Sequence, residues 1–293
     1  SFLQEKTKNS RVFSFGFEPI WNEQLFKQGW SNIYPYYQLR NNPINYANLL
    51  YNIPQLNTIT ALTQKREALV NRIIAKNFIL ELKKKKIFIT PEGLKFLNLE
   101  SVEYLMLPYP IGSKNKLQEI FTPSGDNKFY LYRNPYFLPK IRIVDNYKII
   151  KTFKDFTKTL SQSNFNPQQT ILMEKNPFPK ITPESPLLES KINVECFQNQ
   201  TIIINTKTNK KSLLLVSNYY YPGWEAYIDQ IKTPLFIANL NQMAIVVPEG
   251  NHKVKLRFTS PTLKYGFFIS TITYLCLFIL FIYLKKGYHK SFK

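Results

Sequence analysis

One uninterrupted apolar segment near the C-terminal end constrains this chain more than any other feature. Residues 265–284 read YGFFISTITYLCLFILFIYL and contain no charged side chain. A helix of about 20 apolar residues is long enough to cross the hydrocarbon core of a bilayer. A buried helix of a globular domain would normally carry a polar stripe, and only Ser270, Thr271 and Thr273 interrupt the apolar residues here. We therefore assign residues 263–285 to a transmembrane helix, with the lipid bilayer as its partner.

The charges around this segment predict its orientation. The tail at residues 286–293 is basic, and the positive-inside rule places such a tail in the cytoplasm and the preceding residues outside. Basic residues also occur at 253–264, but most belong to an expected strand of a folded domain, where they need not govern orientation. We expect a bacterial membrane protein whose bulk is extracytoplasmic.

The overall charge favours anionic partners. Lys and Arg number 39 against 19 Asp and Glu, a formal charge of +20. The lysines are nevertheless scattered, so we expect no nucleic acid partner. The one dense run, Lys83 to Lys86, is interpreted as a solvated helix end, and the alternative is contact with anionic lipid or wall polymer. Cys196 and Cys276 predict neither a disulfide nor a metal site.

Residues 181–262 have the pattern of an antiparallel β-sandwich. Short apolar runs are separated by turn residues, at a spacing typical of such domains. The segment HKVKLRF (252–258) alternates basic and apolar side chains, which predicts a strand with one buried face. We expect strands at residues 201–205, 212–218, 224–229, 242–247 and 252–258.

Residues 1–180 mix helix and strand patterns, which predicts an extracytoplasmic mixed α/β region within an overall α+β fold. We expect helices at 64–84, 91–99 and 152–162, where apolar residues or start signals have helical spacing. We expect strands at 11–16, 102–108, 128–134, 140–145 and 170–175. The Pro-rich stretch at 176–190 is the expected linker between the two regions.

The aromatic segment YYYPGW at residues 219–224 allows two interpretations. In the structural one, Pro-Gly occupies the centre of a type II turn and the tryptophan anchors the core between two sheets. In the functional one, the aromatic rings form a stacking surface for sugars. We favour packing, with Tyr219 and Tyr227 as the best exposed candidates. The candidate sugar-contacting residues are Tyr219, Tyr221, Trp224 and Tyr227.

Other polar residues give weaker indications. Arg133 and Asn134 precede a Pro-bounded turn, and an arginine there could bind a phosphate of a lipid-linked donor, although a simple surface arginine is the alternative. Glu225 and Asp229 would lie about 13 Å apart along one strand, too far for glycoside hydrolysis. His252 begins a strand and is expected to hydrogen-bond its own hairpin. We assign no catalytic residue.

Several segments, in this order, resemble the exported C-terminal portion of the YfhO-like bacterial membrane proteins. The resemblance covers most of the chain, and YYPGWEAYIDQIKTPLFIANLNQMAIVVPEGNHKVKLRF (220–258) carries the closest match. Gln230 departs from the usual Gly in that segment, and Arg133 replaces a usual Glu. The other matching segments are NLESVEYLMLPYPI (98–111), YRNPYFLPKIRIV (132–144) and FNPQQTILMEK (165–175).

This resemblance implies membership in the GT-C type glycosyltransferase superfamily, whose polytopic enzymes use polyprenyl-phosphate-linked sugars. It also implies a parent with further helices upstream, a catalytic acidic loop between early helices, and a possible divalent metal there. Because the chain begins at Ser1 without Met and has one membrane segment, we expect that loop to be absent and expect no cofactor in this chain.

The implied role is therefore support of catalysis or contact with the acceptor. The expected partners are a lipid-linked sugar and a cell-surface glycan or polymer. The alternative is a single-pass, membrane-anchored carbohydrate-binding or interaction module without catalysis. A polyanion-binding domain is a third interpretation, based only on the net charge.

Overall fold

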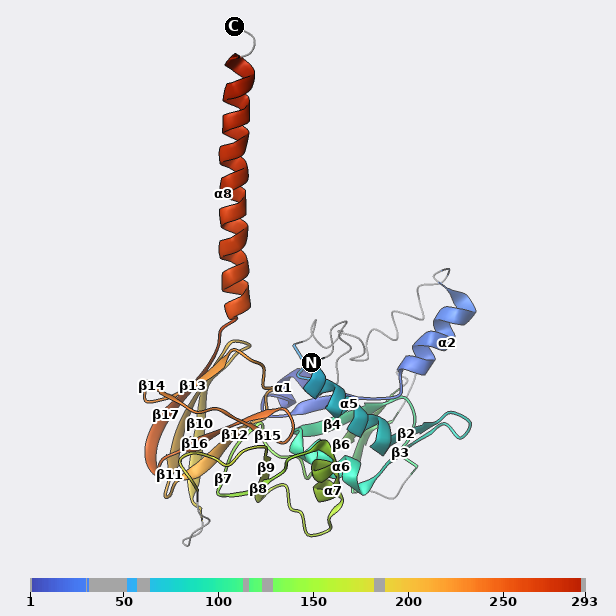
Figure 1. Cartoon of the computed structure of the whole chain (residues 1–293). Coiled ribbons are helices and arrows are strands. Elements are labelled where there is room, and N and C mark those ends of the chain that lie inside the picture. The colour runs from blue at the N-terminus through green and yellow to red at the C-terminus, as the bar shows by residue number, and fades with distance from the viewer. Residues whose placement is uncertain are drawn as a thin grey trace.

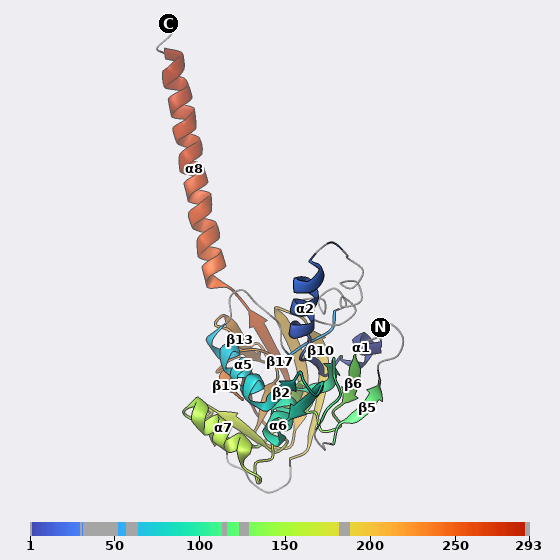
Figure 2. The ribbon, with the colours of Figure 1, turned by 90° about the vertical axis from the view of Figure 1, so that its right-hand side faces the viewer.

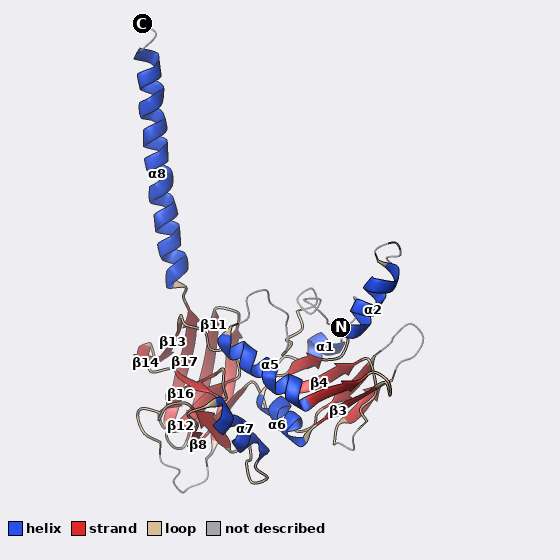
Figure 3. Ribbon diagram, turned by 45° about the vertical axis from the view of Figure 1, so that its right-hand side comes forward, coloured by secondary structure: helices blue, strands red, loops and turns tan. Residues whose placement is uncertain are grey.

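The computed structural model describes residues 2–29, 31, 52–56, 64–112, 116–122, 129–181 and 188–290. It combines several β-sheets with short helices and one long apolar helix at the C-terminal end (Figure 1). The expected α+β fold class is confirmed. Figure 3 shows the strands gathered in two groups, with the short helices between and beside them and the long helix extending away from both.

The N-terminal part is built around a four-stranded sheet of order β1-β4-β6-β5. Strand β1 is parallel to β4, and the other neighbours are antiparallel. A separate hairpin joins β2 and β3. The elements are α1 (Phe2–Lys6), β1 (Arg11–Ser14), α2 (Glu18–Gln28), α5 (Lys65–Asn77), β2 (Phe78–Glu81), β3 (Lys86–Ile89), α6 (Pro91–Leu99), β4 (Val102–Leu107), β5 (Gln118–Phe121) and β6 (Tyr130–Arg133).

The C-terminal part is a sandwich of two sheets, with orders β10-β11-β17-β13-β14 and β7-β12-β16-β15-β9-β8. The second sheet takes β7, β8 and β9 from before residue 181, so the sandwich extends across the expected boundary. The elements are β7 (Ile141–Val144), β8 (Asn146–Ile149), α7 (Phe153–Ser161), β9 (Thr170–Met173), β10 (Ser190–Phe197), β11 (Thr201–Thr208), β12 (Ser212–Val216), β13 (Trp224–Ile228), β14 (Ile231–Thr233), β15 (Phe236–Ala238), β16 (Gln242–Val247), β17 (Gly250–Phe258) and α8 (Pro261–Lys290).

Burial explains the different sequence patterns of the two sheets. Every residue of β12 and β16 is buried, because one face of their sheet packs against the five-stranded sheet and the other against a second apolar cluster. Strands buried on both faces read as continuous apolar runs. Strand β17 buries Val254 and Leu256 and exposes the intervening basic residues, as its alternation predicts.

The expected helix at residues 64–84 is confirmed as far as Asn77 and is wrong for residues 78–84. Helix α5 ends at Asn77, and the chain turns into the β2–β3 hairpin. The side-chain nitrogen of Asn77 donates to Ile73 O, and its side-chain oxygen accepts a hydrogen bond from the Thr90 hydroxyl. These two bonds hold Asn77 at the end of the helix. The lysine run therefore lies at the exposed tip of a hairpin, where Lys85 has a φ of +50°, and not at a helix end.

The expected helices at 91–99 and 152–162 are confirmed as α6 and α7, and their first turns show why they begin where they do. Thr90 caps α6 by accepting a hydrogen bond from the Gly93 amide. Thr152 and Asp155 form a reciprocal capping box at the start of α7. Helices α5, α6 and α7 pack together beside the four-stranded sheet (Figure 2).

Helix α8 is the candidate membrane span. It has 30 residues, a length of about 45 Å, and its window Tyr265–Tyr283 has a mean hydropathy of 2.1 with no residue buried against the rest of the chain. Within the described ranges it is the one helix long and apolar enough to cross a bilayer. Only Thr259 and Ser260 separate it from β17, so the sandwich ends at the foot of the helix (Figure 1).

A tight turn fixes this junction. The Trp224 amide donates to Tyr221 O at 3.2 Å across the turn that contains Gly223, whose φ is +118°, so the predicted Pro-Gly turn is confirmed. The Thr259 amide donates to Gly223 O at 2.9 Å. A Cβ on residue 223 would lie 2.2 Å from Thr259 O. Glycine is therefore required here both by backbone conformation and by close approach.

Replacing Gly223 by Ala should destabilise the folded part by about 2 kcal/mol or more, since it combines backbone strain with a steric overlap. The measurement is the midpoint of urea unfolding of the full chain in detergent micelles. Gly266→Ala is the matched control, because no atom lies within 4 Å of its Cβ position. Equal midpoints for the two variants would contradict this account of the turn.

Candidate functional site

The solvent-facing side of the five-stranded sheet presents an unusual concentration of basic and amide side chains. We call this surface the outer face. Strand register places Lys191 beside Lys207 and then Asn251, and the next row runs through residues 193, 205 and 253. Its basic, amide and aromatic side chains include Lys191, Asn193, Asn205, Lys207, Tyr227, Lys253, Lys255 and Arg257, all exposed or half-buried.

A shallow, open trough of about 450 Å³ lies on the part of this face farthest from α8. Strands β10, β11 and β17 form its floor, and Asp229 and His252 lie at one side. Lysine and asparagine residues predominate in its lining, where the aliphatic parts of the side chains form much of the surface and the ammonium and amide groups lie at their ends. The chemistry therefore suits an extended, oxygen-rich ligand better than an apolar one.

Ion pairs neutralise only part of the outer face. Lys253 Nζ lies 2.6 Å from Glu195, and Asn205 donates to the same carboxylate, so the pKa of Glu195 is lowered by these hydrogen bonds. Lys232 pairs with Glu225 at 2.5 Å. Four cations remain outside the ion pairs formed among the described residues. They are Lys191, Lys207, Lys255 and Arg257.

His252 belongs to the hairpin and is not free to act as a base. Its Nδ1 lies 2.6 Å from Asp229 Oδ2 and its Nε2 lies 3.0 Å from Glu249 O. The Asp229 contact raises the pKa of His252, and the same hydrogen bond lowers the pKa of Asp229. The expectation that His252 hydrogen-bonds its hairpin is confirmed.

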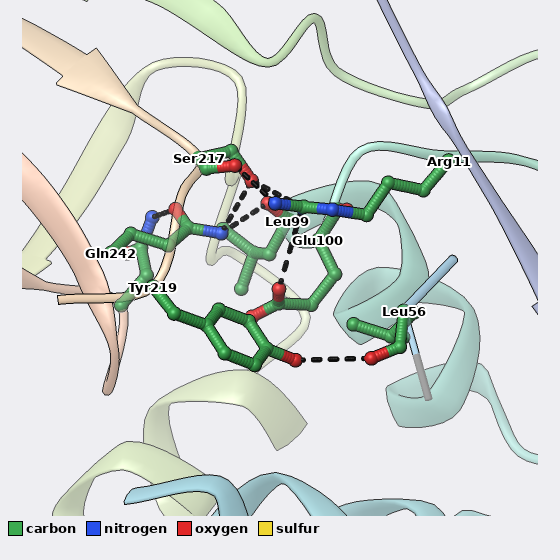
Figure 4. Close-up of polar contacts among 8 residues, drawn as sticks. Arg11, Leu56, Leu99, Glu100, Ser217, Tyr219 and Gln242 are labelled. Carbon is green, nitrogen blue, oxygen red and sulfur yellow. Dashed lines mark hydrogen bonds and ion pairs between the residues drawn. The ribbon is translucent and has the colours of Figure 1, made fainter. Parts of the chain in front are cut away.

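Tyr219 points inwards, which contradicts the expectation that it is one of the best exposed tyrosines. Its hydroxyl donates to Leu56 O at 3.1 Å, and the guanidinium of Arg11 lies 5.9 Å from its ring centre (Figure 4). Burial raises the pKa of Tyr219. The segment between β12 and β13 crosses against the N-terminal region, so this side chain packs there rather than facing solvent.

The other aromatic candidates lie in two different places. Trp224 packs at the edge of the core between the sheets, which confirms the structural interpretation, and its ring lies 5.6 Å from Phe258. Tyr221 is 45% exposed and its ring lies 5.9 Å from the same Phe258. Tyr227 lies on the outer face and donates to Glu225 at 2.9 Å. Only Tyr227 thus lies beside the basic residues of that face.

Arg133 and Asn134 lie on the four-stranded sheet, away from the outer face. Arg133 Nε donates to Glu103 at 3.0 Å, and its side chain is 46% exposed. Asn134 is buried, and its amide nitrogen donates to Asn98 and to Val102 O. Both donors of the Asn134 amide are therefore used within the fold, while Arg133 keeps part of its guanidinium towards solvent.

Sequence reasoning missed a buried polar cluster between the sandwich and the N-terminal region (Figure 4). Arg11 donates to Glu100 O at 2.7 Å, and to Ser217 Oγ at 2.8 Å as well as Ser217 O. Gln242 donates to Leu99 O at 2.8 Å and to Ser217 Oγ at 3.0 Å. No local pattern predicts it, because hydrogen-bonded partners such as Arg11 and Ser217 are 206 residues apart.

Glu100 is the unusual member of this cluster. It is fully buried, and no donor of the described residues forms a hydrogen bond with its carboxylate oxygens. Its closest cation is Arg11, at 3.8 Å. Burial raises the pKa of Glu100 to about 7, against the lowering effect of Arg11. Glu100 has no exposed surface, so we interpret the cluster as structural.

Residues 184–270 match the family model of the bacterial membrane protein YfhO. The YfhO-like region thus contains the whole outer face, the turn at Gly223 and the beginning of α8. The resemblance to YfhO-like proteins is confirmed for this region, which is less than half of the chain. Searches of curated proteins and of solved structures found no match.

The YfhO-like region and its single candidate span agree with association with a bilayer. Of the expected partners, the family match and the span support the lipid bilayer. The match ends inside the span, after its first few residues, so it contains strands β10 to β17 and the foot of α8, while β7, β8 and β9 of the sandwich lie outside it.

Glu100→Gln should make the free energy of unfolding less dependent on pH. The folded pKa of about 7 lies above the ordinary value of 4.5, so the protonated form is favoured by folding. The contribution of Glu100 to stability is complete below pH 4.5 and is lost as pH rises to 7. The loss is of the order of 3 kcal/mol at most, because one pKa unit corresponds to about 1.4 kcal/mol.

The check is urea unfolding of both proteins in micelles at pH 5 and pH 8. We expect Glu100→Gln to gain stability relative to the wild type on going from about pH 5 to about pH 8. Arg11 keeps its bonds to Ser217 and to the backbone in this variant. If the free energies of unfolding of the two proteins differ by the same amount at pH 5 and at pH 8, the raised pKa of Glu100 is contradicted.

Proposed function

We propose that this chain acts as the membrane-anchored, extracytoplasmic portion of a GT-C type glycosyltransferase that uses a polyprenyl-phosphate-linked sugar. Its outer face would hold the cell-surface acceptor, a glycan or polymer, near the bilayer. The role is contact and positioning rather than chemistry. The C-terminal tail would lie in the cytoplasm.

The observation that supports this proposal is the extent of the YfhO match. It covers the outer face and the foot of α8 together, at residues 184–270. A lipid-linked donor has its phosphate and sugar at the membrane surface. The last strand of the outer face is two residues from α8, so an acceptor bound to this face would be tethered on the same side of the bilayer as the donor.

The side chains of the outer face fit an acceptor with many oxygens. Lys191 and Lys207 are cations outside the described ion pairs, and the amides of Asn193 and Asn205 supply both donors and acceptors. Tyr227 adds an aromatic plane on which the apolar face of a sugar ring can stack. Arg133, on the other sheet, remains a candidate for a phosphate through the exposed part of its guanidinium.

A second candidate function is a carbohydrate-binding module without catalysis. The open trough favours it, because binding there requires only the outer face. The two candidates differ in whether sugar transfer depends on the chain.

The test compares two double variants in cells that carry the full-length gene. Lys191→Ser with Lys207→Ser alters the trough, and Lys154→Ser with Lys158→Ser on α7 is the control of equal charge change. We expect the first to lower sugar incorporation into envelope polymers roughly tenfold, about 1.4 kcal/mol of lost acceptor binding, and the second to leave it unchanged. Membrane levels should be equal by immunoblot.

The alternatives give different results. Normal incorporation in the trough variant would contradict the acceptor role. If deletion of the whole gene leaves incorporation unchanged while the purified chain still binds envelope glycans, the non-catalytic module is correct and the enzyme proposal is wrong.

A further inference from the structure

Helix α2 extends from the N-terminal region towards the same side as α8. Figures 1, 2 and 3 share a vertical axis, and in all three the C-terminal end of α2 reaches above the level at which α8 begins. The N-terminal end of α2 joins β1 lower down, next to the four-stranded sheet. The end of α2 therefore lies at the height of the first turn of α8.

The length of α8 shows what lies at that height. The apolar span begins at Tyr265, and the helix begins at Pro261. The helix rises about 6 Å from Pro261 to Tyr265, close to the thickness of one headgroup layer. The foot of α8 is thus in the headgroup layer when the span occupies the hydrocarbon core, and with α8 upright in the bilayer, as it stands in Figure 1, the end of α2 reaches the same layer.

The end of α2 exposes apolar side chains that folding leaves uncovered. Phe26 is 89% exposed and Leu25 is 39% exposed. The neighbouring Lys27 pairs with Glu23 at 2.5 Å, and both are largely in solvent. Burial of such exposed apolar side chains at a membrane interface is favourable, because it removes apolar surface from water.

A second aromatic group lies at the same level, at the foot of α8. The rings of Tyr221 and Trp224, in the turn at Gly223, lie against Phe258, the last residue of β17 before α8. Tyrosine and tryptophan are enriched at the headgroup level of membrane proteins. Tyr221 is the exposed member of this group and Trp224 is half-buried at the edge of the core, so the group marks the end of the sandwich next to α8.

We propose that the end of α2 inserts Phe26 and Leu25 into the outer boundary of the same leaflet that α8 crosses, as a second membrane contact. The bilayer is the expected occupant because α8 already places it at this depth. With two contacts, the folded part lies against the membrane and does not rotate freely about α8. This inference does not depend on the acceptor or on the reaction.

The test uses the full chain in vesicles of phosphatidylcholine and phosphatidylglycerol. Cys196→Ser and Cys276→Ala remove the two native thiols, and Phe26→Cys then carries an environment-sensitive fluorophore. Lys154→Cys on α7 is the control, since α7 lies at the opposite end of the molecule from α8 (Figure 1). Lipids with nitroxide groups near the headgroup serve as quenchers.

We expect the label at position 26 to be quenched several-fold more strongly than the label at position 154. A label at Leu25→Cys should lose most of its quenching when Phe26→Ser is added, although α8 still holds the chain in the vesicle. Equal quenching at positions 26 and 154 would overturn the proposal. Protection of position 26 from both lipid and aqueous quenchers would overturn it too, because a protein surface would then cover Phe26.

Discussion

The connection between β17 and α8 is the constraint on which the rest of the structure depends. Only Thr259 and Ser260 lie between a strand of the outer face and the candidate span, and the Thr259 amide is bonded to Gly223 O. So short and fixed a connection gives the sandwich little freedom to move away from the bilayer. A ligand held on the outer face is therefore kept on the same side of the bilayer as the sandwich, and the trough lies at the end of that face farther from α8.

The buried cluster around Arg11 extends this constraint to the N-terminal region. Arg11 lies on β1, and its partner Ser217 follows β12 of the sandwich. A buried charge pair costs desolvation, and its use is often to specify one arrangement rather than to add stability. We infer that the cluster fixes how the two parts sit together, and thereby where α2 lies relative to α8.

The sequence predicted the features that depend on local pattern. The alternation in β17, the Pro-Gly turn, the start of α6 at Pro91 and the apolar span each arise from residues close together in the chain. Tyr219 could not be placed in this way, because its hydrogen-bond partner Leu56 is 163 residues away. The end of α5 was missed because tertiary bonds to Thr90 override a helical apolar spacing. The membership of β7, β8 and β9 in the sandwich likewise depends on pairing between distant strands.

The central claim is that α8 holds the folded part on the outer side of the cytoplasmic membrane. It is tested most directly by thiol labelling of intact cells stripped of any outer envelope, with a membrane-impermeant maleimide and the native cysteines replaced. Lys255→Cys, on the outer face, should be labelled in intact cells, and Lys286→Cys, in the basic tail, only after the membrane is permeabilised. The reverse pattern, or labelling of neither residue before permeabilisation, would contradict the account.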